Sequence, residues 1–226
     1  MNRIPGVVAV GDAVRIGTWD LGGELPPDLV ELALEERLDV LAMQGVDLDG
    51  NGGCPARAAL VANTPLGSVR TLPLDESARG PNRLTGVAVA SRTPIGHAIA
   101  CPLPNPGQGP DRGLLSCVTE VMGRRIVVVS IELYPFAELG RDAGEPAFAP
   151  VWAELGYHLA ALNLLPMVVA GVLHTNRWDL AGEHRFTAAL DGGEPQILCT
   201  AGLEPVSAIR VGDLHVAEVM VTGAPR

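Results

Sequence analysis

The chain has 226 residues, 47% of them hydrophobic, and a formal net charge of −10 at pH 7. All 16 basic residues are arginines, which excludes a Schiff-base lysine and a phosphate-loop lysine. The negative charge opposes nucleic acid, because duplex recognition rests on several Lys/Arg–phosphate contacts. No apolar run is long enough to span a membrane, and four widely spaced cysteines are typical of reduced thiols in a cytoplasmic protein. We therefore expect one cytoplasmic domain over residues 1–226.

The first half of the chain alternates short strand-like and helix-like segments. Alternating or continuous apolar residues predict strands, and a 3.6-residue apolar period predicts helices. In chain order we expect a strand at 14–19, a helix at 26–37, a buried strand at 39–44 that ends at Gly45-Val46, a loop at 47–55, a short helix at 56–63, a strand at 68–72, and an antiparallel hairpin of strands 85–91 and 96–101.

The second half opens with a loop at residues 102–112, which contains four prolines and is long enough to form a lid or rim. The expected elements after it are a hairpin of strands 114–122 and 125–133, a helix at 148–164, a buried strand at 167–170, a short helix within 176–190, and strands at 196–200, 206–210 and 215–221.

The stretch L-P-M-V-V-A-G-V-L-H-T-N, residues 165–176, anchors the functional prediction. A strand buried on both faces presents its first polar side chains at its carboxyl end, where open α/β sheets collect ligands. His174 takes this place here, although a lone histidine after a strand is more often a hydrogen-bonded loop residue. The two strand–helix–strand units resemble each other, so two facing sheets with helices outside would place Asp20, Glu132 and His174 around one cleft.

Taken in this order, the motifs I-G-T-W-D, D-V-L-A-M-Q-G-V, G-V-A-V-A-S-R-T-P-I, A-G-V-L-H and V-G-D-L-H-V resemble those of the endonuclease/exonuclease/phosphatase superfamily. The resemblance covers residues 14–221 and implies the DNase I-like fold, a four-layer α/β/β/α sandwich. G-V-A-V-A-S-R-T-P-I is the closest match, and it bears on the fold rather than on the chemistry.

The resemblance also implies that most of the family's working residues are replaced. Asp20 stands for a metal-supporting asparagine, and Gly45 stands for the glutamate that binds the metal. Val172 replaces the aspartate that activates water, and His174 replaces an asparagine. Glu132 occupies the place of a catalytic-site histidine.

Asp213 matches the aspartate of the family's closing S-D-H motif, while Leu214 stands where its histidine is expected. His215 could substitute only after a one-residue slip, which on a strand would turn it to the other face. Phosphodiester hydrolysis in this family needs a divalent ion, a water-positioning carboxylate and a histidine. We therefore expect that this reaction is lost.

Three functions remain open for a cleft with the candidate catalytic residues Asp20, Glu132, His174 and Asp213, and with Trp19 and His215 as candidate substrate-binding residues. The first is a non-catalytic binding scaffold. The second is a repurposed acid–base enzyme that cyclises or isomerises a small, uncharged or cationic, non-phosphate molecule. Neither needs a cofactor. The third is a divergent metal-dependent hydrolase with a rebuilt Asp/Glu/His site for Mn or Zn.

A calcium loop is the less favoured interpretation of D-L-D-G-N-G at residues 47–52. Its alternating oxygen ligands fit the start of such a loop, but Ala58 stands at the twelfth position, where a bidentate glutamate is required. We expect a polar turn.

Overall fold

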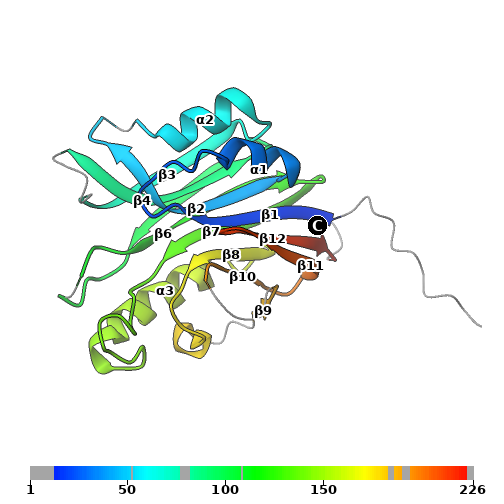
Figure 1. The fold of residues 1–226 in the computed structure, drawn as a ribbon. Helices are drawn as coiled ribbons and strands as arrows, with labels where there is room; N and C mark the ends of the chain where they lie inside the picture. The colour runs from blue at the N-terminus through cyan, green and yellow to red at the C-terminus, as the bar shows by residue number, and fades with distance from the viewer. Residues whose placement is uncertain are drawn as a thin grey trace, which may run out of the picture.

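The computed structural model of the chain describes residues 13–51, 53–76, 82–107, 109–182, 186–189 and 194–222. Two six-stranded sheets pack face to face, and helices lie outside each of them (Figure 1). The expected four-layer α/β/β/α arrangement, the DNase I-like sandwich, is confirmed.

The first sheet has the strand order β11-β12-β1-β2-β4-β3. The parallel pair β1–β2 is flanked by antiparallel strands on both sides. Its strands are β1 (Ala13–Asp20), β2 (Val40–Asp49), β3 (Ser68–Glu76), β4 (Arg83–Ser91), β11 (Leu203–Val211) and β12 (Leu214–Val221).

The second sheet has the strand order β5-β6-β7-β8-β10-β9, with one parallel pair, β7–β8. Each sheet therefore contains one parallel pair built from a strand–helix–strand unit. The strands are β5 (His97–Pro102), β6 (Gly113–Val121), β7 (Arg124–Glu132), β8 (Met167–Val172), β9 (Thr187–Ala188) and β10 (Gln196–Cys199).

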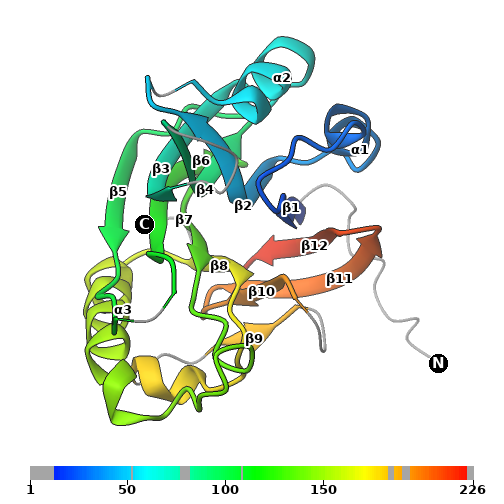
Figure 2. The ribbon, with the colours of Figure 1, turned by 60° about the vertical axis from the view of Figure 1, so that its left-hand side comes forward.

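In the described part of the chain, three α-helices cover the outer faces of the sheets. Helices α1 (Leu29–Glu35) and α2 (Pro55–Asn63) pack on the first sheet, and α3 (Ala149–Leu162) packs on the second (Figure 2). Short 3₁₀ helices lie at Pro146–Phe148 and Trp178–Ala181, the second within the segment expected to hold a short helix. Residues 183–185 and 190 of that segment lie outside the described residues. No helix within the described ranges is both long and apolar enough to cross a membrane.

Strand alternation decides which side chains reach the space between the sheets. In the central strands β1, β7 and β8, apolar residues with even numbers form the inter-sheet core, as Ile16, Val128 and Val168 do. Odd-numbered neighbours such as Val129 and Val169 pack under the helices. The even-numbered side chains at the ends of these strands therefore belong to the inter-sheet face.

Two expectations about strands were wrong. Residues 85–91 and 96–101 do not form a hairpin, because β4 lies in the first sheet and β5 pairs with β6 in the second. The link between them passes from one sheet to the other, and Ile95 is buried in the inter-sheet core. Strand β2 does not end at Gly45; it continues to Asp49 through a register shift between Met43 and Val46, so the loop expected at 47–55 begins later.

Candidate functional site

The ends of several strands meet at one edge of the sandwich. Asp20, Glu132 and Val172 are the last residues of β1, β7 and β8, and all three have the even numbers of the inter-sheet face. Asp213 lies in the turn between β11 and β12, beside the end of β1. Since carboxyl ends of parallel strands share one edge, this is where the chain concentrates polar side chains.

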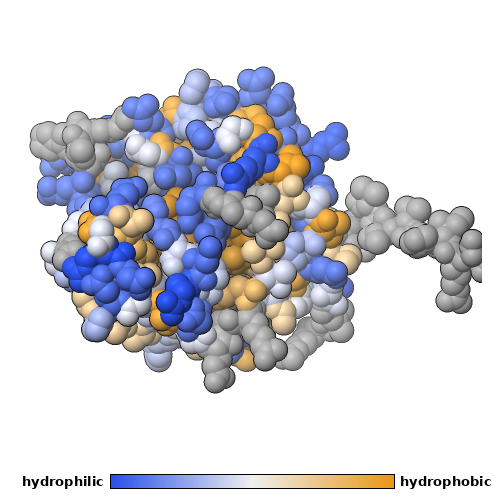
Figure 3. All heavy atoms as spheres, turned by 60° about the horizontal axis from the view of Figure 1, so that its bottom comes forward, coloured by the Kyte–Doolittle hydropathy of each residue, from blue (hydrophilic) through white to orange (hydrophobic). Residues whose placement is uncertain are grey.

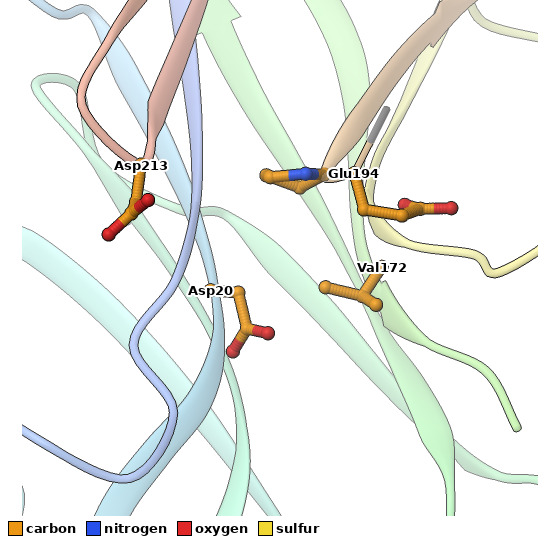
Figure 4. Close-up of a pocket in the computed structure, with 5 residues that line it drawn as sticks. Asp20, Val172, Glu194 and Asp213 are labelled. Atoms are coloured by element: carbon orange, nitrogen blue, oxygen red, sulfur yellow. The ribbon is translucent and has the colours of Figure 1, made fainter. Parts of the chain in front are cut away.

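A cavity of about 190 Å³ opens at this edge, lined by Asp20, Val172, Glu194, Pro195 and Asp213 (Figure 4). The side chain of Val172 points toward Asp20, whereas the carboxylate of Glu194 points away from both aspartates. The structure therefore brings Asp20 and Asp213 to one cavity. Across it Asp20 faces the apolar side chain of Val172, because the carboxylate of Glu194 is turned away.

Glu132 is neutralised by an arginine instead of pairing with a histidine. Its carboxylate forms a salt bridge with the guanidinium of Arg112, and each of the two side chains is only 15% exposed. The second oxygen accepts a hydrogen bond from the backbone N–H of Gly45 at 3.3 Å. Burial raises the pKa of Glu132 although Arg112 opposes this shift, and the charge of Asp20 adds to it.

His174 stands just beyond β8 in a left-handed backbone conformation, with φ of 52°. Its N–H donates to Glu194 Oε1 at 2.7 Å, and the N–H of Leu173 donates to Glu194 Oε2 at 3.0 Å. Burial lowers the pKa of the imidazole, and the nearby charge of Arg112 lowers it further. Among the described residues, no direct hydrogen bond joins His174 to Glu132.

A polar layer separates this site from the apolar inter-sheet core. Thr18 donates to Gln44 Oε1 at 3.1 Å, and Gln44 Nε2 donates to Ser130 Oγ at 2.9 Å. Ser130 in turn donates to the carbonyl of Met43 at 2.9 Å. All four residues are fully buried, so the chain Thr18–Gln44–Ser130 joins the two sheets directly beneath the cavity.

The backbone at Gly45 does not fit the metal-binding glutamate that the resemblance implies for this position. Gly45 has φ of 57°, and a Cβ atom would lie 2.8 Å from the N atom of Gly22 and 2.9 Å from Asp20 Oδ1. Asp20 thus occupies the space that a side chain at position 45 would need. Val172 supplies no ligand, and Arg112 already pairs with Glu132. The residues present do not fit the family's metal arrangement.

Trp19 and His215, the two candidate substrate-binding residues, lie on opposite faces of the first sheet. Trp19 is 5% exposed and packs with α1 residues in the outer core, on the opposite face of β1 from Asp20, so it does not line the cavity. Leu214, which stands where the histidine of the family motif is expected, packs under the helices. His215 is buried on the inter-sheet face, and its Nδ1–H donates to the carbonyl of Pro195, a cavity residue, at 2.5 Å.

Arg112 and Glu194 were missed from the sequence. Both stand just before a strand, Arg112 before β6 and Glu194 before β10. Because β6 and β10 run antiparallel to β7 and β8, their starts lie beside the ends of those strands; Gly113 pairs with Glu132, and Gln196 pairs with Gly171. A polar residue just before a strand therefore indicates a site residue when that strand is known to pair antiparallel with a strand that ends at the site.

The described residues contain no group of three or more His, Cys, Asp or Glu side chains arranged to hold a metal ion. The segment that resembles a calcium loop makes other contacts. Asp49 Oδ1 accepts from the N–H groups of Asn51 and Gly53 at 2.9 and 2.6 Å, and Asp47 pairs with Arg83. These bonds are those of a polar turn.

Comparison with known proteins agrees with this architecture. The model of the Endonuclease/Exonuclease/phosphatase family matches residues 17–214. A search of curated proteins returned no match. Among solved structures, the human Nocturnin catalytic domain with bound sulfate superposes with a TM-score of 0.66 at 14% identity, covering 93% of this chain and 94% of that one.

Two further structures are similar. An endonuclease/exonuclease/phosphatase family protein from Leptotrichia buccalis has a TM-score of 0.63 at 14% identity, covering 92% of this chain and 99% of that one. Sphingomyelinase C from Streptomyces griseocarneus has a TM-score of 0.56 at 14% identity, covering 91% and 99%. At these identities the likeness shows the fold alone, whereas the family model spans most of the chain. The chain therefore belongs to the endonuclease/exonuclease/phosphatase family.

Proposed function

We propose that this family member binds a small cationic or uncharged molecule in the cavity at Asp20 and Asp213, and that it does not hydrolyse phosphodiesters with a metal ion. The observation that carries the proposal is the backbone at Gly45, which leaves no room for a ligand side chain there. The carboxylate of Asp20 fills that space instead. A phosphate in this cavity would lie beside two aspartates, and such like charges repel.

The size of the cavity supports a small ligand. Drug-sized ligands occupy pockets of about 300–1,000 Å³, while this cavity measures about 190 Å³. Val172 and Pro195 offer an apolar wall, and the two aspartates offer acceptors for an ammonium, guanidinium or hydroxyl group. This combination suits a short carbon chain that ends in a hydrogen-bond donor.

The Glu132–Arg112 pair favours binding over acid–base catalysis by Glu132. A general base must reach the proton that it removes, and Glu132 is committed to a guanidinium and a backbone amide. His174 has no direct bond to it. The acid–base enzyme remains the second candidate, with Asp20 as its accessible carboxylate, and product analysis separates the two.

The hydrolysis part is tested with purified protein and millimolar Mg²⁺ or Mn²⁺, using bis-p-nitrophenyl phosphate, single-stranded DNA, duplex DNA and RNA. We expect no turnover above the protein-free blank, and no difference between the wild type and Asp213→Asn. Metal-dependent turnover that disappears in Asp213→Asn would instead establish the rebuilt metal hydrolase.

The binding part is tested by thermal unfolding at low salt with alkylammonium and alkylguanidinium compounds, the matching alcohols and inorganic phosphate. The cations should raise the unfolding midpoint, and Asp20→Asn should remove this shift; phosphate should give none. Glu31→Gln, a change on the outer helix α1, serves as the matched control for a lost charge. Equal shifts in Asp20→Asn and Glu31→Gln would refute binding at the cavity, and a new product by NMR would favour the enzyme.

A further inference from the structure

Arg112 and Glu132 form an ion pair inside the candidate site. Both side chains are 15% exposed, and Arg112 Nε is buried without a hydrogen-bond partner in the described structure. Such a pair is costly to desolvate, and it becomes far costlier when one partner is removed and the other charge stays buried. The carboxylate of Glu132 therefore needs a cation, and the chain itself provides one.

The backbone fixes the arginine in this position. Arg112 ends the proline-rich segment and directly precedes Gly113, which pairs with Glu132 across β6 and β7. The carbonyl of Arg112 accepts a hydrogen bond from the N–H of Leu103 at 2.8 Å, which closes the base of the segment. A cation that the fold holds directly before a neighbouring strand loses little entropy when it pairs with its carboxylate, so it has an advantage over an ion from solution.

The surroundings of the pair are acidic. The charges of Asp20 and Asp75 act on Glu132 in the same direction as its burial, while Arg112 is the cation that opposes them. The N–H of Gly45 adds a neutral donor on the other carboxylate oxygen. Without the guanidinium, this environment would attract a cation from solution.

The face in Figure 3 mixes hydrophilic and hydrophobic residues. The most exposed large apolar side chains of the described residues are Tyr157 on α3 and Leu164 just beyond its end. Ser116 and His158 form a buried hydrogen-bonded pair under α3, away from the cavity described above.

From these contacts we propose that Arg112 is the built-in cation of the cleft, holding at Glu132 the place that a divalent cation would otherwise take. This role is separate from ligand binding at Asp20 and Asp213, because it makes one residue, Arg112, decide whether a cation from solution binds at Glu132. It also extends the misfit at Gly45, because the carboxylate of Glu132 meets a positive charge that the chain itself supplies.

The test measures Mn²⁺ binding to purified full-length protein by the loss of the free-ion EPR signal, with thermal unfolding in parallel. Arg112→Gln should bind one Mn²⁺ at least about tenfold more tightly than the wild type. Arg112→Lys keeps the positive charge and should resemble the wild type. The double variant Arg112→Gln/Glu132→Gln removes both charges and should lose the gain, while adventitious surface binding stays equal in all four proteins.

Equal Mn²⁺ affinity in the wild type and Arg112→Gln would overturn the proposal. If Arg112→Gln does not fold, the wild type and the charge-free double variant still decide, because the proposal expects them to bind Mn²⁺ equally weakly. A wild-type site that disappears in the double variant would mean that Glu132 holds the metal despite Arg112. These results are independent of the small-molecule and hydrolysis assays, so either proposal can fail alone.

Discussion

Restoring a side chain at position 45 is the most direct test of the site's geometry. Gly45 has φ of 57°, and an added Cβ would lie 2.8 Å from the backbone N of Gly22 and 2.9 Å from Asp20 Oδ1. The left-handed conformation costs a non-glycine residue about 1–2 kcal/mol, and forcing an atom into occupied space costs about 1–3 kcal/mol. Gly45→Ala should therefore destabilise the protein by about 2–5 kcal/mol.

Gly22 provides the matched control. Its φ is 56°, almost that of Gly45, but a Cβ there would meet nothing within 4 Å. Gly22→Ala should therefore show only the backbone part, about 1–2 kcal/mol. The difference in unfolding free energy between Gly45→Ala and Gly22→Ala therefore measures what it costs to displace Asp20 and the backbone at Gly22.

Urea unfolding followed by circular dichroism measures both variants, and thermal unfolding should place Gly45→Ala at least about 4 °C below the wild type. Gly45→Glu, which restores the residue of the family motif, should be at least as unstable and should gain no metal-dependent hydrolysis. Equal midpoints for Gly45→Ala and Gly22→Ala would refute the steric reasoning. A stable, hydrolytic Gly45→Glu would refute the conclusion that Asp20 has taken the space.

Ser130→Ala should lower the free energy of unfolding by about 1–3 kcal/mol in urea. The reason is that the Gln44 amide loses its buried acceptor at 2.9 Å. A change below about 0.5 kcal/mol would mean that water replaces the hydroxyl. Glu132→Gln should lower the thermal midpoint, since it leaves a buried guanidinium without its counterion, and an unchanged midpoint would contradict a structural role for the pair. Burial lowers the pKa of His158, so its contribution to stability is complete above the ordinary value of 6.5 and is lost as the pH falls through the lowered pKa. His158→Gln should flatten this acid-side loss in unfolding curves recorded across that range, whereas an identical pH profile would refute the assignment.

The strands at the centre of the fold follow from local chemistry. A short apolar run bounded by Gly171 predicts a buried strand at 167–170, and the structure has β8 there, ending two residues later at Val172. The same reasoning predicts helix α3 from its 3.6-residue apolar period, with His158 on the buried face. Such elements depend on neighbours a few residues away, so the sequence carries their full signal.

Strand pairing followed from the sequence only in part: the hairpin of β6 and β7 was expected, whereas the partner of β5 was not. The five-residue link 92–96 is compatible with a hairpin, but burial of Ile95 between the sheets directs β5 to the other sheet. Likewise, the face of His215 follows from the register of β12 against β1, in which His215 pairs with Thr18 and shares its inter-sheet face. Both outcomes are set by burial across the sandwich, which no local pattern encodes.

The sequence by itself determined the layers of this protein and the strand ends at which Asp20, Glu132 and Asp213 lie, because alternation and strand length are local properties. Tertiary structure alone decided what those carboxylates meet. Arg112 reaches Glu132 because β6 runs antiparallel to β7, and Asp20 fills the space beside Gly45 because the chain turns back at Gly22. Charge neutralisation and steric exclusion act between residues distant in sequence, so they exist only once the sheets have assembled.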